Sequence, residues 1–527
     1  MTGYGGGIHD GKGYSISPNN PNTIPQPTLT KNGPVSEQEA ARNSQRIASP
    51  NLPQSSAQRS TSSQRPPITR ESLCMLEFES IINNRELRHV INFNPHLCFK
   101  PHFDIENSRK KKLEAEEYWS LLKQDFQNSL SPLQACDQNP AGDERIRDIF
   151  CEVKHILRTL VPERDLQLIG DILDVDLLMQ QVRRKVLDYP RLASSLADVV
   201  YQHCAPMRDD CVHKMVTTIG RGAANQDVEC LVEGVKELFT VLENMKLDVA
   251  NHQITSLRIL LVENTLGFET QYFLSKIRHG RIDVGPSRHW FTECQAHSRP
   301  EEKPTSVFVR GVVDLVLSAN DDAFPATFQF DDERLKCLRW DLQNVIAVQI
   351  CVDIFERASY ELAVWPLPRE ILESLRGRIK ILLGRDGICL EKMSDAAIDI
   401  GSCLEHVSGG RFRLSEASLI SITRHLQEDS SRDSQAWKRR ENDLRQPLLS
   451  EVQRRMEEFS KLPILAIADI ALHNLELEKN QFGPSFAYIT RTLAHLSTIH
   501  WRVWAPILYL RPDEVESESG NQEDHVS

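Results

Sequence analysis

A hydrophobic repeat of three and four residues is the feature that most constrains the fold of this chain. The segment "CLVEGVKELFTVLENMKLDV" (230–249) has such a repeat, formed by Leu231, Val235, Leu238, Leu242, Met245 and Val249. This spacing puts the apolar side chains on one face of an α-helix, whereas a half-buried strand would alternate apolar and polar residues. Similar stripes begin at Val175 and Leu493, and few segments alternate as strands do. We therefore predict an all-α fold, a multi-helix domain of long amphipathic helices.

Composition divides the 527 residues into parts of different character. Residues 1–72 hold 9 of the 27 Pro and 7 of the 24 Gly, with many Ser, Thr, Asn and Gln. A segment of this kind cannot bury enough apolar surface to offset the entropy lost on ordering. We predict a disordered tail at 1–72, a helical extension at 73–144, a helical domain at 145–510 and a short acidic disordered tail at 511–527. Polar stretches at about 281–306 and 426–447 are expected to separate three helical blocks.

Helix capping signals predict several helix ends. Asp174 and Asp188 each precede an apolar stripe, as N-cap residues do. Gly220 follows the stripe that begins after Pro206, and glycine commonly ends helices. We therefore expect helices to begin after the two aspartates and one helix to stop at Gly220.

Net charge and cysteine usage restrict the classes of partner and the compartment. The tail at 1–72 carries +3 and the tail at 511–527 carries −5, so the core at 73–510 carries −10. This acidity argues against a general nucleic-acid partner, although a local basic patch stays open. The 12 Cys include no CxxC pair, and neither a signal peptide nor an apolar run long enough for a transmembrane segment is found. We expect an intracellular, cytoplasmic protein; "NSRKKKLEAEEYW" (107–119) is either a solvated helix start or a nuclear signal.

The segment "QHCAPMRDDCVH" (202–213) raises the question of a metal site, because it holds two His, two Cys and two Asp. Pro206 separates two helices and puts Asp209 and Asp210 in the first turn of the second, where negative charge is favourable without a metal. On that helix Asp209 and His213 share one flank, four residues apart, and Cys211 projects from nearly the opposite flank. We interpret the stretch as a helix-to-helix corner. A site of Asp209 and His213 completed from elsewhere stays open as an alternative.

A polar interruption in the long helix is a candidate recognition site. "DVANHQITSLR" (248–258) brings Asn251, Gln253 and Arg258 into an otherwise apolar helical segment. Buried polar groups need partners, so these side chains either recognise a ligand or form a polar network of the protein's own fold. If Arg258 is buried, it must find a carboxylate from its own chain or from a partner.

Two serines of the N-terminal tail are candidate phosphorylation sites. "RIAS" and "RSTS" place Arg46 three residues before Ser49 and Arg59 three residues before Ser62, a pattern that basophilic kinases recognise. Pro50 also makes Ser49 a proline-directed candidate. Disorder would make both serines accessible to a kinase.

Two long blocks of sequence carry a family resemblance. The segments "LDVDLLMQQVRRKVLDYPRLASSLADVVYQHCAPMRDDCV" (173–212) and "ELFTVLENMKLDVANHQITSLRILLVENTLGFET" (237–270) resemble the T-complex protein eleven family, including its fungal suppressor-of-kinase branch. The resemblance continues in "PATFQFDDERLKCLRWDLQ" (325–343) and "HLSTIHWRVWAPILYL" (495–510) and spans most of 145–510. It implies an all-helical, fungal protein associated with cyclic AMP and protein kinase A signalling, with protein partners from that pathway.

No catalytic motif accompanies the resemblance. The chain contains no HExxH and no G-x-S-x-G, and we expect no cofactor and no bound metal. The leading hypothesis is a non-enzymatic helical adaptor or regulator in cyclic AMP and protein kinase A signal transduction. Two alternatives stay open: a metal-dependent hydrolase whose ligands come from distant helices, and a structural scaffold that binds a larger assembly.

Overall fold

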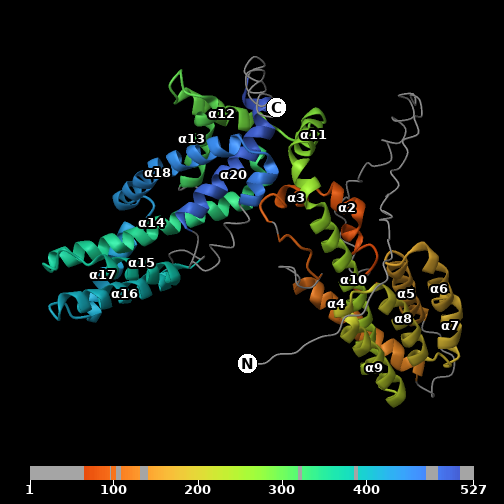
Figure 1. Cartoon of the computed structure of the whole chain (residues 1–527). Coiled ribbons are helices and arrows are strands. Elements are labelled where there is room, and N and C mark those ends of the chain that lie inside the picture. Colours follow the sequence, from red (N-terminus) through yellow and green to blue (C-terminus); the bar gives the residue numbers. More distant parts are fainter. Residues whose placement is uncertain are drawn as a thin grey trace, which may run out of the picture. The chain divides into compact units, whose positions relative to one another are not determined.

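The computed structural model describes residues 65–94, 96–101, 109–130, 140–318, 323–384, 390–470 and 485–510. Within these ranges the chain is helical and contains no strand, which confirms the predicted all-α fold (Figure 1). None of its helices in these ranges is long and apolar enough to cross a membrane.

The helices before residue 280 are η3 (Cys74–Leu76), α2 (Phe78–Asn83), α3 (Arg85–Val90), α4 (Arg109–Leu130), α5 (Pro140–Arg158), η4 (Glu163–Asp165), α6 (Leu166–Ile172), α7 (Val175–Arg183), α8 (Tyr189–His203), η5 (Pro206–Arg208), α9 (Asp209–Asn225), α10 (Val228–Glu263) and α11 (Thr265–Arg278). The later helices are α12 (Gly285–Ala296), α13 (Pro304–Leu317), η6 (Ala326–Phe328), α14 (Asp332–Glu361), α15 (Arg369–Leu383), α16 (Leu390–Ser408), α17 (Glu416–Asp429), α18 (Gln435–Ser460), α20 (Phe486–Trp504) and the π turn η7 (Ala505–Tyr509).

The long helix α10 forms because its apolar stripe can be buried along most of its length. Asp227 caps its start by accepting hydrogen bonds from the backbone N–H groups of Glu229 and Cys230. Leu231, Leu238, Leu242 and Met245 are buried as the stripe predicts. Val249 is 45% exposed, so the stripe leaves the core one turn earlier than the spacing suggests.

The α9–α10 hairpin is packed closely at two glycines. A Cβ on Gly222 would lie 2.8 Å from the backbone N of Leu231, and a Cβ on Gly234 would lie 2.3 Å from Cγ1 of Ile219. These contacts require glycine. The expected helix stop at Gly220 is wrong: α9 continues to Asn225 and ends at Gln226, which has left-handed backbone.

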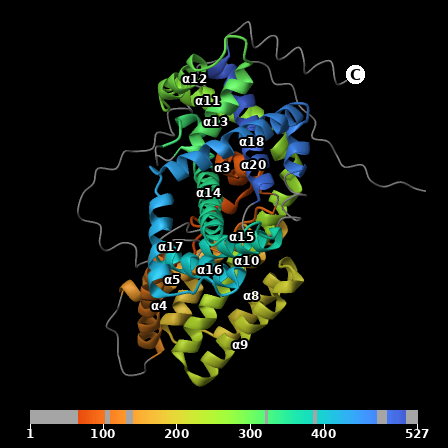
Figure 2. The same cartoon turned by 90° about the vertical axis from the view of Figure 1, so that its left-hand side faces the viewer.

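The buried side chains form two hydrophobic cores. The first core contains buried residues from Ile68 to Leu342 and from Leu448 to Tyr509. The second core contains buried residues from Ile346 to Trp437 and lies among α14, α15, α16 and α17, which are neighbours in both views (Figures 1 and 2). Helix α14 contributes its first half to the first core and its second half to the second.

The boundaries observed differ from the expected ones at two places. Residues 65–72 were assigned to the disordered tail, yet Ile68 is buried in the first core and the backbone N of Arg70 donates to Glu152 at 2.9 Å. The polar stretch 426–447 was expected to separate helical blocks, yet the only break in it is 430–434, after which α18 begins. Ser434 caps α18, which accommodates Pro447. The division between 144 and 145 stays a prediction, although Arg145 pairs across it with Asp125.

Candidate functional site

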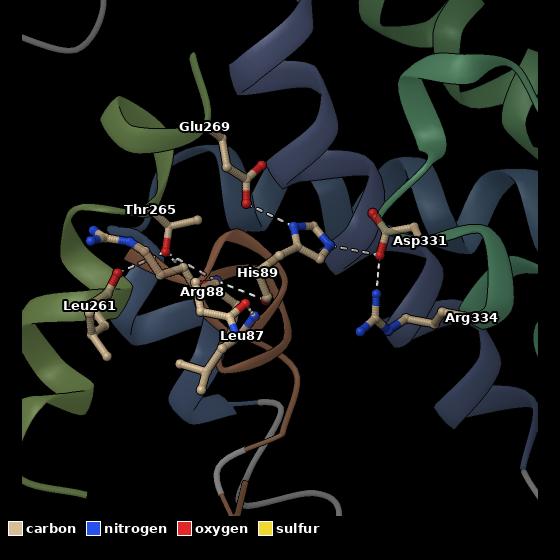
Figure 3. A network of polar contacts seen from close by, with 10 residues as sticks. Leu87, Arg88, His89, Leu261, Thr265, Glu269, Asp331 and Arg334 are labelled. Atoms are coloured by element: carbon tan, nitrogen blue, oxygen red, sulfur yellow. Dashed lines mark hydrogen bonds and ion pairs between the residues drawn. The ribbon is translucent and has the colours of Figure 1, made fainter. Parts of the chain in front are cut away.

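A buried histidine joins three distant segments of the chain. Nδ1 of His89, on α3, donates to Oε1 of Glu269 on α11 at 2.8 Å, and Nε2 donates to Oδ1 of Asp331, just before α14, at 2.9 Å (Figure 3). All three side chains are no more than 5% exposed. Because each ring nitrogen faces a carboxylate, the ring must carry a proton on both nitrogens, which is the charged form.

Electrostatics favour this charged histidine despite its burial. Burial alone would lower the pKa of His89, but the charges and hydrogen bonds of Asp331 and Glu269 outweigh it and raise the pKa to about 10. Burial likewise opposes ionisation of Asp331, yet His89 and Arg334 hold the pKa of this carboxyl below its usual range. The positive charges of His89 and Arg334 balance the two carboxylates, and the buried Arg88 adds a further positive charge that attracts Glu269.

Local contacts position His89. Asn84 caps α3 by accepting from the backbone N of Leu87 at 3.1 Å. The side-chain amide of Asn92 donates to the carbonyl of His89 at 3.0 Å and to Oγ1 of Thr265 at 3.1 Å, which ties the end of α3 to the start of α11. The network is therefore fixed by backbone contacts as well as by charge.

Cation–π contacts cover both sides of this arrangement. The guanidinium of Arg88 lies 4.1 Å from the ring centroid of Phe268, and that of Arg334 lies 3.8 Å from the ring centroid of Phe93. Arg334 also pairs with Asp331. The aromatic rings exclude water from the ion pairs, which strengthens the attraction between the charges.

Two further buried histidines, on α20, are neutral. Burial is the main reason why the pKa values of His495 and His500 fall to about 3. His500 stacks on Phe328 with ring centroids 3.8 Å apart, and its Nε2 accepts from the hydroxyl of Tyr509 at 3.1 Å. Oγ1 of Thr327 lies 3.3 Å from the same hydroxyl.

The buried network suits helix assembly better than catalysis. Both nitrogens of His89 are engaged, so the ring offers no free base, and general acid–base chemistry needs a group within reach of a substrate. The cavity beside Tyr189 and the cavity beside Trp290 are both lined by other residues than His89, Glu269 and Asp331. We interpret the network as a clamp that holds α3 against α11 and α14.

The candidate recognition site formed by Asn251, Gln253 and Arg258, the polar lane, is engaged mainly by the chain itself. Oδ1 of Asn251 accepts from the backbone N of Phe99 at 2.6 Å, and Nδ2 donates to its carbonyl at 3.2 Å. Arg258 pairs with Asp469 at 3.0 Å, so it finds a carboxylate of its own chain. Gln253 projects about 200° around the helix from Asn251, and the three side chains therefore do not share one face.

Some lane atoms remain unpaired. Oε1 of Gln253 and Nε and Nη2 of Arg258 are buried without a hydrogen-bond partner among the described residues. A role in recognition stays a prediction for these three residues.

The 202–213 stretch forms the predicted corner between helices. Asp188 and Asp174 cap α8 and α7 as expected, and Asp209 and Asp210 lie in the first turn of α9. Asp209 contacts Sγ of Cys204 at 3.8 Å, and His213 is exposed. In the ranges that the structure describes, no group of three or more His, Cys, Asp or Glu residues could hold a metal ion.

A small polar cavity lies between α12 and α13. Its volume is about 150 Å³, and its charged groups pair with each other or with nearby side chains. Arg310 bonds Glu302 at 2.8 and 3.0 Å, and Asp314 pairs with Arg445. Burial raises the pKa of the Cys294 thiol to about 11, which makes it a poor nucleophile.

Sequence reasoning did not identify the buried network. Glu269, Asp331, His495 and His500 all lie inside the blocks 237–270, 325–343 and 495–510 that carry the family resemblance. Their position in these blocks could have marked them as candidate site residues. His89 precedes the blocks, so the resemblance did not mark it. The candidate phosphorylation sites Ser49 and Ser62 lie outside the described residues.

The chain is similar to one family and to several curated proteins. The sequence model of the family T-complex protein 11 matches residues 87–513, a range that contains the whole buried network. Protein SOK1 of Saccharomyces cerevisiae is 30% identical over 55% of this chain and 33% of its own length. The T-complex protein 11 homologs of Rattus norvegicus and Homo sapiens are 25% and 26% identical, over 36% and 38% of this chain and 30% and 44% of their own lengths. This chain thus spans less than half of the length of these relatives, and no solved structure matches it.

Proposed function

Because the chain belongs to the T-complex protein 11 family, we propose that it is a non-enzymatic helical adaptor or regulator in cyclic AMP and protein kinase A signal transduction. The similarity to Protein SOK1 carries this proposal, since it is the match that points to the suppressor-of-kinase branch. The assignment to the kinase pathway rests on the resemblance to that branch. The pathway, the partners and the absence of catalysis are all parts of the proposal.

The geometry of the polar groups supports an adaptor more than an enzyme. The most heavily buried charges stabilise helix contacts, and the charged residues Arg310 and Asp314 of the cavity between α12 and α13 form ion pairs with Glu302 and Arg445. An adaptor acts through its surface, whereas an enzyme needs reactive groups that face a substrate.

Affinity capture with quantitative mass spectrometry tests the proposal. The full chain is tethered and exposed to a fungal lysate with and without cyclic AMP, and the regulatory and catalytic subunits of protein kinase A are quantified. Deleting 173–270 would remove α7 to α10 and the first part of α11, residues 265–270, so a point variant is the better control. His89→Ala, which should expose apolar surface, controls for non-specific binding.

We expect kinase-pathway subunits to be enriched by the native chain and not by the His89→Ala variant. A second readout is the cyclic AMP concentration that half-activates purified kinase, which should shift when the chain is added. Recovery of no kinase-pathway protein together with an unchanged activation curve would contradict the proposed function.

The hydrolase alternative makes a different prediction. Elemental analysis of freshly purified protein should then find about one metal per chain, and the Asp209→Ala, His213→Ala double variant should lose it. Such a result would replace the adaptor proposal, since both residues are surface-accessible candidates rather than parts of the clamp.

Exposed aromatic side chains favour the scaffold alternative. Trp340, Tyr360 and Trp365 are 51%, 72% and 56% exposed, on α14 and the loop that follows it. Aromatic residues of this kind often anchor protein interfaces. Sedimentation of the chain with and without lysate would show stable incorporation into a large assembly if it is a scaffold.

A further inference from the structure

The larger cavity lies where α7, α8, α9 and α10 meet. It has a volume of about 280 Å³, and its apolar walls are formed by Val182, Leu187, Tyr189, Pro190, Ala223 and Leu231. An apolar cavity of about 150 Å³ is large enough to hold a benzene ring. This cavity can therefore accept one large aromatic or aliphatic side chain.

Lys185 lines this cavity, and three further basic residues flank its lining residues in sequence. Arg184, Arg191 and Arg221 are exposed, and each is adjacent in sequence to a lining residue. In the part of the chain that the structure describes, none of the three forms an ion pair. The surface beside the cavity is thus locally positive, although residues 73–510 carry a net charge of −10.

Asp188 lines the cavity, and Asp227 and Glu229 lie close to the lining residue Gln226 in sequence. Asp188 accepts from the backbone N of Arg191 at 3.0 Å, and Asp227 caps α10. Glu229 pairs with Lys123 at 2.6 Å. The capping hydrogen bonds of Asp188 and Asp227 come from neutral backbone N–H groups and leave both carboxylates charged, and Arg221 attracts Asp227. Positive charge still exceeds negative charge here, because Lys185 in the lining and Arg184, Arg191 and Arg221 beside it outnumber these two carboxylates.

Helix dipoles do not account for this arrangement. A cation at a helix C-terminus is stabilised by the dipole, which suffices for Arg184 at the end of α7. Arg191 instead lies in the first turn of α8, where a positive charge is unfavourable, and Arg221 lies before the last turn of α9. Two of the three arginines therefore need another explanation.

We propose that this cavity and its basic rim form a docking site for an acidic segment of a partner protein, which inserts one large apolar side chain between α7, α8, α9 and α10. Its carboxylates pair with Arg184, Arg191 and Arg221, while the cavity removes the anchor side chain from water. Val186, which is 65% exposed beside the lining residue Leu187, extends the apolar contact. The inference rests on the proposed function in that the chain acts by binding proteins, and it adds the surface and the chemistry of the partner.

Fluorescence anisotropy with synthetic peptides tests the site on the full chain. Three labelled peptides of equal length are compared: an acidic peptide with a central Trp, the same peptide with Ala for Trp, and a version with Lys for every Glu. Two variants alter the site, the triple charge reversal Arg184→Glu, Arg191→Glu, Arg221→Glu and the cavity-filling Ala223→Phe. The triple reversal Arg424→Glu, Lys438→Glu, Arg439→Glu, at exposed positions of α17 and α18, is the matched control.

The acidic Trp peptide should bind the native chain at least about tenfold more tightly than the Ala and Lys peptides, a difference of about 1.4 kcal/mol. Both site variants should weaken its binding by at least about tenfold, and the control reversal should leave it within about twofold. Circular dichroism confirms that each variant is folded.

Equal binding of the Trp peptide by the native chain and both folded site variants, or no binding at all, would overturn the site. This outcome does not depend on the kinase capture. If the Arg184, Arg191, Arg221 variant loses the peptide but still captures kinase subunits, the docking site is supported and the signalling proposal stands through another surface. If peptide binding is as expected and capture fails in the native chain, the site stands and the signalling proposal falls.

Discussion

The two hydrophobic cores of this chain differ in where their charged side chains lie. The first core encloses His89, Glu269 and Asp331, each at most 5% exposed, together with two neutral histidines. Among the described residues between 346 and 437, which supply the second core, the buried polar side chains are Ser359, Ser408 and Ser430, so none of them is ionisable. Its ion pairs lie at the edge, as in Arg440 with Asp353 and Arg378 with Asp399.

The difference follows from the lengths of chain that each core must join. His89 is 180 residues from Glu269 and 242 residues from Asp331, so the first core joins distant segments. Buried charges are expensive to desolvate, but they tolerate only one set of partners and can thereby specify which helices meet. The second core joins consecutive helices, whose short connections already limit the possible arrangements.

The largest expected effect is the loss of His89. His89→Ala leaves Glu269 and Asp331 buried without their shared cation, and breaking a buried pair typically costs about 3–5 kcal/mol. The urea midpoint should fall, and hydrogen exchange should rise in residues 85–94 and in α11. A midpoint within experimental error of the native one would show that the two cores do not differ in the way described. Asp353→Asn at the edge of the second core is the comparison variant.

The second core should respond to packing alone. Leu375 on α15 is fully buried, and Leu375→Ala should cost about 2–5 kcal/mol through lost burial and the cavity left behind. Because the thiol of Cys351 is the one titratable group found buried among the described residues between 346 and 437, this cost should be the same at pH 5 and pH 8. A cost that changes strongly between these pH values would contradict the contrast between the cores.

The first core should instead lose stability at both extremes of pH. The raised pKa of His89, about 10, adds stability that is complete below about pH 6.5 and is lost as pH rises toward 10. The lowered pKa values of His495 and His500, about 3, add stability above about pH 6.5 that is lost as pH falls toward 3. Hydrogen exchange of α20 at pH 4.5, 7 and 9.5 measures the loss of stability in acid and the loss in base. The variant His500→Phe should reduce only the loss in acid.

The capped and periodic elements of the fold could be predicted from sequence, because their causes are local. The spacing in 230–249 predicted α10, and Asp174 and Asp188 were correctly identified as caps. The helix end predicted at Gly220 was wrong because a glycine in the sequence can either end a helix or lie inside one. In α9, Gly222 lies inside the helix at a close contact with Leu231. The prediction for the polar segment 426–447 was wrong because polar and charged residues also form helices, where charges pair along the exposed side, as Arg440 does with Asp443.

The buried network and the docking cavity depend on tertiary structure and could not be predicted in the same way. Nothing local to His89 in "RELRHV" reveals that two carboxylates more than a hundred residues away will face its ring. Arg184, Arg191 and Arg221 lie on three different helical segments, so their proximity to one cavity depends on how α7, α8 and α9 pack. The polar lane had a local signal in Asn251, but its partner Phe99 is 152 residues away.

Truncation of the N-terminal tail should have a smaller effect that depends on where the cut is made. Removing residues 1–72 deletes Ile68, which is 4% exposed, and should cost about 1.5–3 kcal/mol for that side chain. Removing residues 1–64 should leave the melting temperature nearly unchanged, since we expect that segment to be disordered from its composition. A large drop for the shorter deletion would show that the tail contributes to the first core.

The smallest effect should come from the edge of the second core. Asp353 and Arg440 form a bidentate pair with N–O distances of 2.6 Å, but both side chains are about a third exposed. Pairs of this kind contribute about 0.2–1 kcal/mol. Asp353→Asn should therefore shift the urea midpoint slightly, and less at high salt. A loss as large as that of His89→Ala would remove the distinction between the buried and the edge pairs.

Nitrogen NMR of histidine-labelled protein tests the central claim, that a charged His89 clamps the first core. The chain has 17 histidines, and an ordinary histidine is neutral at pH 8.5. The clamp predicts one imidazolium at this pH, with both ring nitrogens protonated and hydrogen-bonded, and its disappearance in the Asp331→Asn, Glu269→Gln double variant. A spectrum at pH 8.5 in which every histidine of the folded native chain is neutral would contradict the account.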